Sequence, residues 1–135
     1  MIGVVLIADN GPALEAMTRS VASLPHVRIV RHCHGHAHIG ASLKRCAPDL
    51  VLLDEMHWPR LALQRLDEIR EVLPEARIVV RAARPDAGWL ADALRAGASA
   101  VVPATAGAET LGVVLQEVVA ERQRGDHLDS TRLAA

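Results

Sequence analysis

A carboxylate directly behind an apolar run is the residue of this sequence best placed to do chemistry. In DLVLLDEMHWP, residues 49–59, the run Leu50 to Leu53 ends on Asp54, and turn-forming residues and Pro59 follow. An aspartate carboxylate can attack a phosphoryl group as a nucleophile. Asp54 is therefore either a phosphate acceptor or the remnant of one.

Metal-ligating side chains form the second candidate, in RHCHGHAH at residues 31–38. The stretch contains His32, Cys33, His34, His36 and His38, and imidazole and thiolate are ligands of zinc, nickel and copper. A strand that turns into a helix sends successive side chains in different directions, which favours a solvated turn with a partly buried Cys33 over a metal site. A third alternative is that His34 or His36 leans toward acidic residues and titrates near neutral pH.

The overall composition fits one soluble domain. The 135 residues carry 15 Lys and Arg against 16 Asp and Glu, which gives no sign of a basic surface for nucleic acid or an anionic membrane. The two cysteines, Cys33 and Cys46, form neither a disulfide framework nor a CxxC pair, and the first residues, MIGVVLIADN, have no basic segment ahead of the apolar run. We therefore expect a cytoplasmic protein without a membrane segment, in which any DNA binding belongs to another domain.

The elements that must position these residues alternate along the chain between apolar runs and segments of helical period. The predicted strands are 3–9, 28–32, 50–54, 77–82 and 99–103, and the predicted helices are 12–24, 37–46, 62–73, 87–98 and 108–123. Continuous apolar runs are typical of parallel strands that are covered on both faces. The pattern predicts an α/β fold, a (βα)5 three-layer sandwich around a five-stranded parallel sheet.

Ligands of such a sheet bind beyond the carboxyl ends of its strands. The residues that follow the five predicted strands are Asp9 and Asn10, His32 to His38, Asp54, Ala82, and Pro103 to Thr105. Both aspartates and the histidine stretch are therefore predicted at one edge of the sheet.

Four segments, in this order and spacing, resemble the receiver domain of two-component response regulators, the CheY-like group, and in particular its NarL/LuxR branch. They are VVLIADN, PDLVLLDEMHWP, EARIVVRAA and ALRAGASAVVPATAGAETL, and the resemblance covers residues 2–123. It implies the flavodoxin-like strand order 2-1-3-4-5 that CheY has. It also implies a sensor histidine kinase as a partner.

The resemblance assigns roles to individual residues. Asp54 matches the phosphoacceptor, and Asp9, Asp54 and the backbone carbonyl of Met56 match the ligands of a Mg²⁺ ion. This ion would neutralise charge on the phosphoryl oxygens during transfer. Because the implied order makes Asp9 and Asp54 end neighbouring strands, we expect their carboxylates to lie close together, with Ala82 beside them.

Four positions depart from the receiver pattern. Ala8 replaces the first of two acids, Ala82 replaces the Ser or Thr that bonds the phosphoryl group, Ala104 replaces the Lys, and Val101 replaces the aromatic switch residue. A phosphoryl group on Asp54 would lose two charge-assisted contacts, each normally worth about 1.5–3 kcal/mol. We therefore expect switching that is weak or independent of phosphorylation.

The fourth helix, fifth strand and fifth helix form the output or dimer face in this family. The residues that we expect there are Trp89, Leu90, Ala93, Val113, Val114 and Glu117. They predict a homodimer that forms without phosphate, anchored by Trp89. The alternative is that Trp89 packs against its own neighbours.

The last residues suggest a longer protein. The apolar period of the final helix ends at Gly125, and we assign residues 1–123 to the receiver and 124–135 to a linker. This linker resembles the connector to a C-terminal helix-turn-helix domain that the chain lacks, through which DNA would be bound. A receiver that stands alone is the alternative.

Three functions follow from these features. We favour a non-enzymatic receiver in a phosphorelay that controls transcription, with weakened or phosphorylation-independent switching. The alternatives are a conventional receiver that accepts a phosphoryl group at Asp54, and a pseudo-receiver whose altered pocket binds a ligand or a partner.

Overall fold

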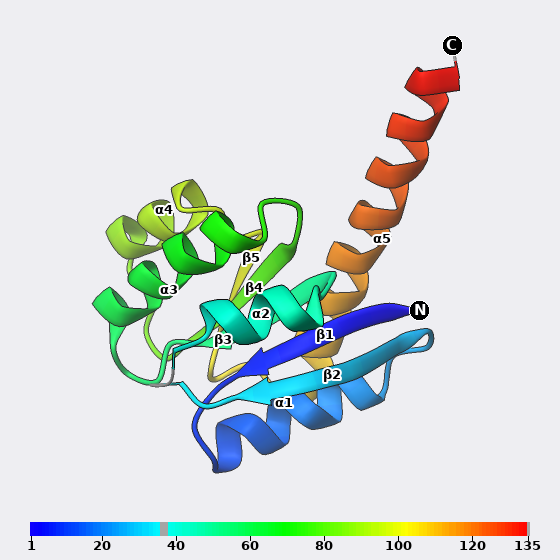
Figure 1. Ribbon diagram of the computed structural model, residues 1–135. Coiled ribbons are helices and arrows are strands. Elements are labelled where there is room, and N and C mark those ends of the chain that lie inside the picture. Colours follow the sequence, from blue (N-terminus) through cyan, green and yellow to red (C-terminus); the bar gives the residue numbers. More distant parts are fainter. Residues whose placement is uncertain (36–37, 135) are drawn as a thin grey trace.

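The computed structural model describes residues 1–35 and 38–134, with side chains up to residue 124 apart from residue 123. Strands and helices alternate along the chain (Figure 1). The elements are β1 (Ile2–Ile7), α1 (Pro12–Ala22), β2 (Val27–Cys33), α2 (Gly40–Cys46), β3 (Leu50–Asp54), α3 (Pro59–Val72), β4 (Arg77–Ala82), α4 (Ala87–Arg95), β5 (Ala100–Pro103) and α5 (Ala108–Ala134).

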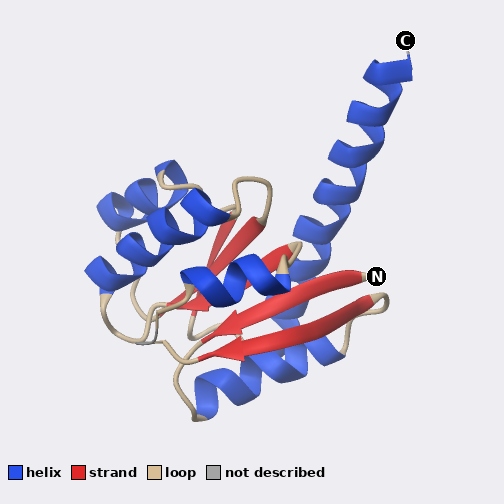
Figure 2. Ribbon diagram, viewed as in Figure 1, coloured by secondary structure: helices blue, strands red, loops and turns tan. Residues whose placement is uncertain are grey.

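The five strands form one parallel sheet in the order β2-β1-β3-β4-β5, which confirms the predicted fold class and strand order. Helices cover both faces of this sheet (Figure 2). Alternate residues of β1 are buried on opposite faces of the sheet. Val5 and Ile7 pack with α2, α3 and α4, whereas Val4 and Leu6 pack with α1 and α5. Each buried aliphatic side chain of this kind stabilises the fold by about 2 kcal/mol.

The strand β2 lies at one edge of the sheet and is much more exposed than β1, β3 and β4. Its pairing with β1 shifts register between Val4 and Val5, and Arg28, Arg31 and His32 on β2 are exposed. Charged side chains and an irregular register discourage another strand from pairing with a free edge. These features disfavour the pairing of a further strand with β2.

The helix α5 continues to Ala134, so the prediction that this helix ends before Gly125 is wrong. A glycine inside a helix costs only about 1 kcal/mol relative to alanine and does not end a helix by itself. The final turns extend away from the sheet (Figure 1). The assignment of 124–135 as a linker stays a prediction. Within the described residues, no helix is long and apolar enough to span a membrane.

Candidate functional site

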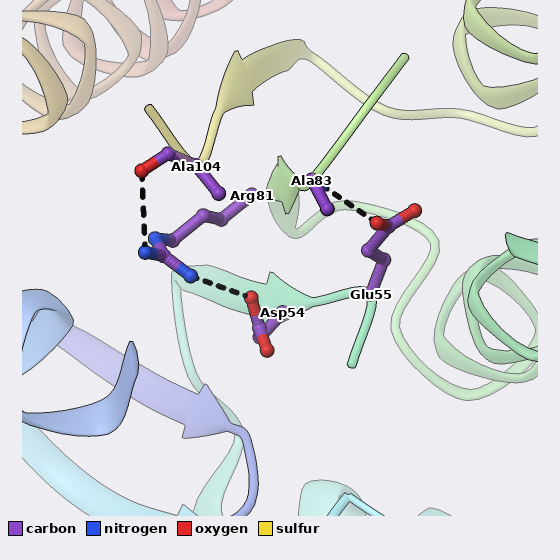
Figure 3. Close-up of polar contacts among 5 residues, drawn as sticks. All are labelled: Asp54, Glu55, Arg81, Ala83 and Ala104. Atoms are coloured by element: carbon purple, nitrogen blue, oxygen red, sulfur yellow. Dashed lines mark hydrogen bonds and ion pairs between the residues drawn. The ribbon is translucent and has the colours of Figure 1, made fainter. Parts of the chain in front are cut away.

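Asp54 is the last residue of β3, where its carboxylate binds an arginine of the neighbouring strand. Asp54 and Arg81 are paired across β3 and β4, and the Arg81 Nη1 atom lies 3.1 Å from Asp54 Oδ1 (Figure 3). The Asp54 side chain is only 11% exposed and the Arg81 side chain only 18%. Because little water screens this pair, the guanidinium neutralises the carboxylate more effectively than it would at the surface.

The same guanidinium reaches a second element. The Arg81 Nη2 atom donates a long hydrogen bond, 3.4 Å, to the backbone carbonyl of Ala104, between β5 and α5. The backbone N–H of Ala104 in turn donates to the carbonyl of Ala82 at 2.7 Å. Arg81 therefore joins the end of β3 to the β5–α5 loop.

The predicted switch positions, like Ala8, carry apolar side chains. Ala8 and Ala82 are fully buried, so their methyl groups stand where the receiver pattern has an acid and a hydroxyl. Val101 is half-buried and packs against the core on the α2, α3 and α4 side of the sheet. None of these side chains can donate a hydrogen bond to a group on Asp54.

Asp9 lies at the same edge of the sheet as Asp54. It follows β1, which pairs directly with β3 so that Ile7 lies opposite Leu53. This arrangement agrees with the prediction that both acids end neighbouring strands. The Asp9 Oδ1 atom is 3.4 Å from the Nε2 atom of His34, and both side chains are substantially exposed. Of the histidines in the described part of the 31–38 stretch, His34 thus leans toward an acid, as one alternative expected.

Gly35 lies close to both Met56 and Asp9. A Cβ atom added to Gly35 would overlap the Met56 sulfur and lie 3.1 Å from Asp9 Oδ1, so a larger residue would not fit at this position. The buried Arg65 of α3 fixes Gly35 by donating from Nη2 to its carbonyl at 2.9 Å. Met56 adopts a left-handed φ of 56°, an uncommon conformation for a residue other than glycine.

The side chains described at this edge do not fit the expected Mg²⁺ site. Mg²⁺ requires near-octahedral oxygen ligands. Here Ala8 stands where the receiver pattern has an acid, and Arg81 engages the carboxylate of Asp54. Within the described residues, no three His, Cys, Asp or Glu side chains are placed to hold a metal ion.

Two residues at the start of the histidine stretch, His32 and Cys33, have other surroundings than a metal site. The Nε2 atom of His32 lies 2.8 Å from the carbonyl of Ala8, and Cys33 is buried. Burial raises the pKa of the Cys33 thiol, which disfavours the thiolate that binds metals. His36 lies outside the described residues.

Sequence reasoning missed two residues of this site, Arg81 and Glu55. Glu55 is buried, and its Oε1 atom accepts a hydrogen bond of 2.6 Å from the backbone N–H of Ala83, which fixes the β4–α4 loop (Figure 3). A signal was present for Arg81, because a charge inside a strand that is covered on both faces, as in RIVVRA, needs a partner. Glu55 follows its strand and gave no such signal.

The expected dimer face is only partly exposed. Ala93 is fully buried in the core, so its assignment to this face is wrong. Trp89 is half-buried, and its Nε1 atom donates to the Pro59 carbonyl at 2.9 Å, so it packs against its neighbours as the alternative expected. The remaining residues range from half-buried to exposed: Leu90, Val113, Val114 and Glu117.

Comparison with known proteins identifies relatives by structure only, since no family model and no curated protein sequence matches this chain. A response regulator from Thermotoga maritima superposes with a TM-score of 0.73 at 17% identity, covering 89% of this chain and 99% of that one. A LuxR-family two-component response regulator from Aurantimonas sp. SI85-9A1 gives 0.70 at 20% identity, covering 90% of this chain and 87% of that one.

This chain has the CheY-like receiver fold. The same fold occurs in a Burkholderia thailandensis E264 protein assigned to pilus assembly, which superposes with a TM-score of 0.70 at 18% identity over 89% of this chain and 99% of that one. The receiver fold therefore serves proteins with different outputs, and the fold alone does not choose among them.

Proposed function

We propose that this chain is the regulatory receiver module of a response regulator, without enzymatic turnover, and that its switching is weak or independent of phosphorylation. The observation that carries this proposal is the ion pair between Arg81 and Asp54. A carboxylate engaged by a guanidinium is a poorer nucleophile, because the attacking lone pairs are stabilised by the positive charge. The neighbouring Ala82 and Ala104 offer a transferred phosphoryl group no side-chain contact.

A conventional phosphoacceptor at Asp54 is the second candidate. The same guanidinium favours it in one respect, because the arginine fork binds phosphate oxygens through two parallel hydrogen bonds. Arg81 would then have to leave Asp54 Oδ1 and turn toward the phosphoryl group. The two candidates thus differ in whether Arg81 protects Asp54 or receives its product.

A small phosphodonor separates these candidates. The chain is incubated with acetyl phosphate and Mg²⁺, intact mass reports a phosphoryl adduct, and sedimentation velocity reports assembly. We expect little adduct and an unchanged sedimentation coefficient. Full modification that Asp54→Asn abolishes, together with altered sedimentation, would establish the conventional receiver instead.

The output proposed for this module is transcription control in the cytoplasm, with a sensor histidine kinase upstream and DNA bound through a helix-turn-helix domain outside this chain. Support comes from the receiver fold shared with LuxR-family regulators and from the tail sequence ERQRGDHLDSTRLAA at residues 121–135. A reporter gene under a LuxR-type promoter, measured with and without the full-length regulator, tests this assignment.

A homodimer without phosphate remains part of the proposal, with a revised choice of test residues. Leu90 on α4 and Val113 on α5 are exposed apolar side chains, whereas Trp89 also stabilises the fold through Pro59. We therefore expect Leu90→Asp and Val113→Asp to weaken the dimer in sedimentation equilibrium without loss of helicity. A monomer at high protein concentration in the unmodified chain would exclude this assembly.

A further inference from the structure

We propose that Arg81 is the resident cation at the carboxyl edge of the sheet, in place of both a divalent ion and a lysine, and that it holds the β5–α5 loop in one conformation through Ala104. This inference deepens the proposed receiver function and rests on it. It explains why the Mg²⁺ ligands implied by the sequence do not fit the site.

The charge balance of the pocket supports the first part. Three carboxylates lie at this edge of the sheet, those of Asp9, Asp54 and Glu55, and that of Glu55 already accepts from the Ala83 N–H. One positive charge lies 3.1 Å from Asp54 Oδ1. A divalent ion bound to Asp54 would be repelled by this guanidinium at short range in a poorly hydrated site. Bound Mg²⁺ would therefore require Arg81 to leave.

The hydrogen bonds of Arg81 support the second part. In the receiver pattern a lysine at position 104 extends from the loop toward the aspartate, whereas here position 104 carries only a methyl group. The contact runs in the opposite direction, because the Arg81 side chain extends from β4 to Asp54 and to the carbonyl of Ala104. Loss of the Asp54 contact would free the guanidinium and weaken its hold on this carbonyl.

The adjacent acid provides an internal control. Glu55 follows Asp54 in sequence but binds the backbone N–H of Ala83, in the β4–α4 loop. Two consecutive carboxylates at the end of β3 thus hold two different loops. Changes at Arg81 should affect the β5–α5 loop, and changes at Glu55 should affect the β4–α4 loop.

Backbone amide NMR of the full chain, titrated with Mg²⁺, tests the proposal. Arg81→Ala should shift the amide resonances of Ala104 and Thr105, leave Ala83 nearly unchanged, and strengthen Mg²⁺ binding about tenfold or more, because a charge beside the carboxylates is removed. Glu55→Gln should shift Ala83 and leave Mg²⁺ binding unchanged. Arg28→Ala, at an exposed arginine of β2 near the opposite edge of the sheet, should change neither Ala83 nor Mg²⁺ binding.

Equal Mg²⁺ affinity in the unmodified chain and in folded Arg81→Ala, or an unmoved Ala104 amide, would overturn the inference. Should Arg81→Ala fail to fold, Arg81→Met retains much of the apolar stem and Asp54→Asn breaks the ion pair from the other side, with the same readout at Ala104. Phosphodonor modification of Asp54 in the unmodified chain would count against the proposed function alone, so the two failures are distinguishable.

Discussion

Two aspartates bracket β3, and each binds an arginine. Before the strand, Asp49 Oδ1 lies 3.1 Å from Nη2 of Arg122, and its Oδ2 atom accepts from the Gly3 N–H at 3.0 Å. At the end of the strand, Asp54 Oδ1 lies 3.1 Å from Nη1 of Arg81. The two ion pairs have the same chemistry and nearly the same length but lie at opposite edges of the sheet.

Their surroundings give them different roles. Arg122 belongs to α5 and also donates to the carbonyl of Glu75 at 2.8 Å, so the Asp49 pair ties the last helix to the amino edge of the sheet. The Asp54 pair lies at the carboxyl edge, where ligands of this fold bind. Topology, more than the chemistry of the pair, decides which ion pair is an anchor and which lies at the edge of the sheet where ligands of this fold bind.

Removal of the Asp49 carboxylate should have the largest effect on stability. Asp49→Ala eliminates hydrogen bonds to Gly3 and Arg122, one of them charged on both sides, and we expect the free energy of unfolding to fall by about 2–3 kcal/mol. Urea unfolding followed by circular dichroism measures it. Asp92→Ala, which breaks an exposed pair with Arg95, should cost less than about 0.5 kcal/mol. Equal losses in both variants would show that Asp49 is no anchor.

The Asp54 pair should contribute less to stability than Asp49 does. We expect a double-mutant cycle of Asp54→Ala and Arg81→Ala to give a coupling energy of about 1 kcal/mol, above that of most exposed pairs because both side chains are mostly buried. The same urea experiment provides all four free energies. A coupling energy near zero would mean that the Asp54 and Arg81 charges do not stabilise each other. The contrast drawn between this ion pair and the Asp49 pair would then be wrong.

The smallest expected effect is a difference in the rate of chemical modification between the two cysteines, Cys33 and Cys46. Burial raises the pKa of the Cys33 thiol, so it stays protonated at neutral pH, whereas Cys46 at the end of α2 is only half-buried. We expect iodoacetamide to modify Cys33 about tenfold more slowly than Cys46 at pH 7, with the rate at Cys33 rising as the pH increases. Cys33→Ser and Cys46→Ser identify the two phases by mass, and faster modification of Cys33 would contradict its burial.

The strands at the centre of the sheet were predictable with their bounds, and the charged side chains of the pocket were not. The apolar runs 50–54 and 77–82 coincide with β3 and β4 because both faces of these strands are buried. The charge of Arg81 inside a covered strand indicates that this side chain needs a partner, but it does not indicate which residue the partner is. Only the pairing of β3 with β4 brings the two charges together, and this pairing depends on contacts distant in sequence.

The error at Ala93 has a related cause. Helix α4 is apolar on more than one side, so the types of its residues do not reveal which side faces the sheet. The structure buries Ala93 and leaves Leu90 and Leu94 exposed, because a small side chain allows the helix to approach the strands closely. The length of α5 was missed for another reason, since a single glycine and polar residues are compatible with a helix as well as with a loop.

Because Arg122 fixes α5 to the amino edge of the sheet, a tilt of the helix at this point would move its far end. Twelve residues separate Arg122 from the end of the helix at Ala134, which corresponds to about 18 Å of helix beyond the anchor. A tilt of about 10° at Arg122 would displace that end by about 3 Å, on the rise of an α-helix. A small rearrangement at the amino edge of the sheet would thus move the end of α5 by a distance comparable to the width of a side chain.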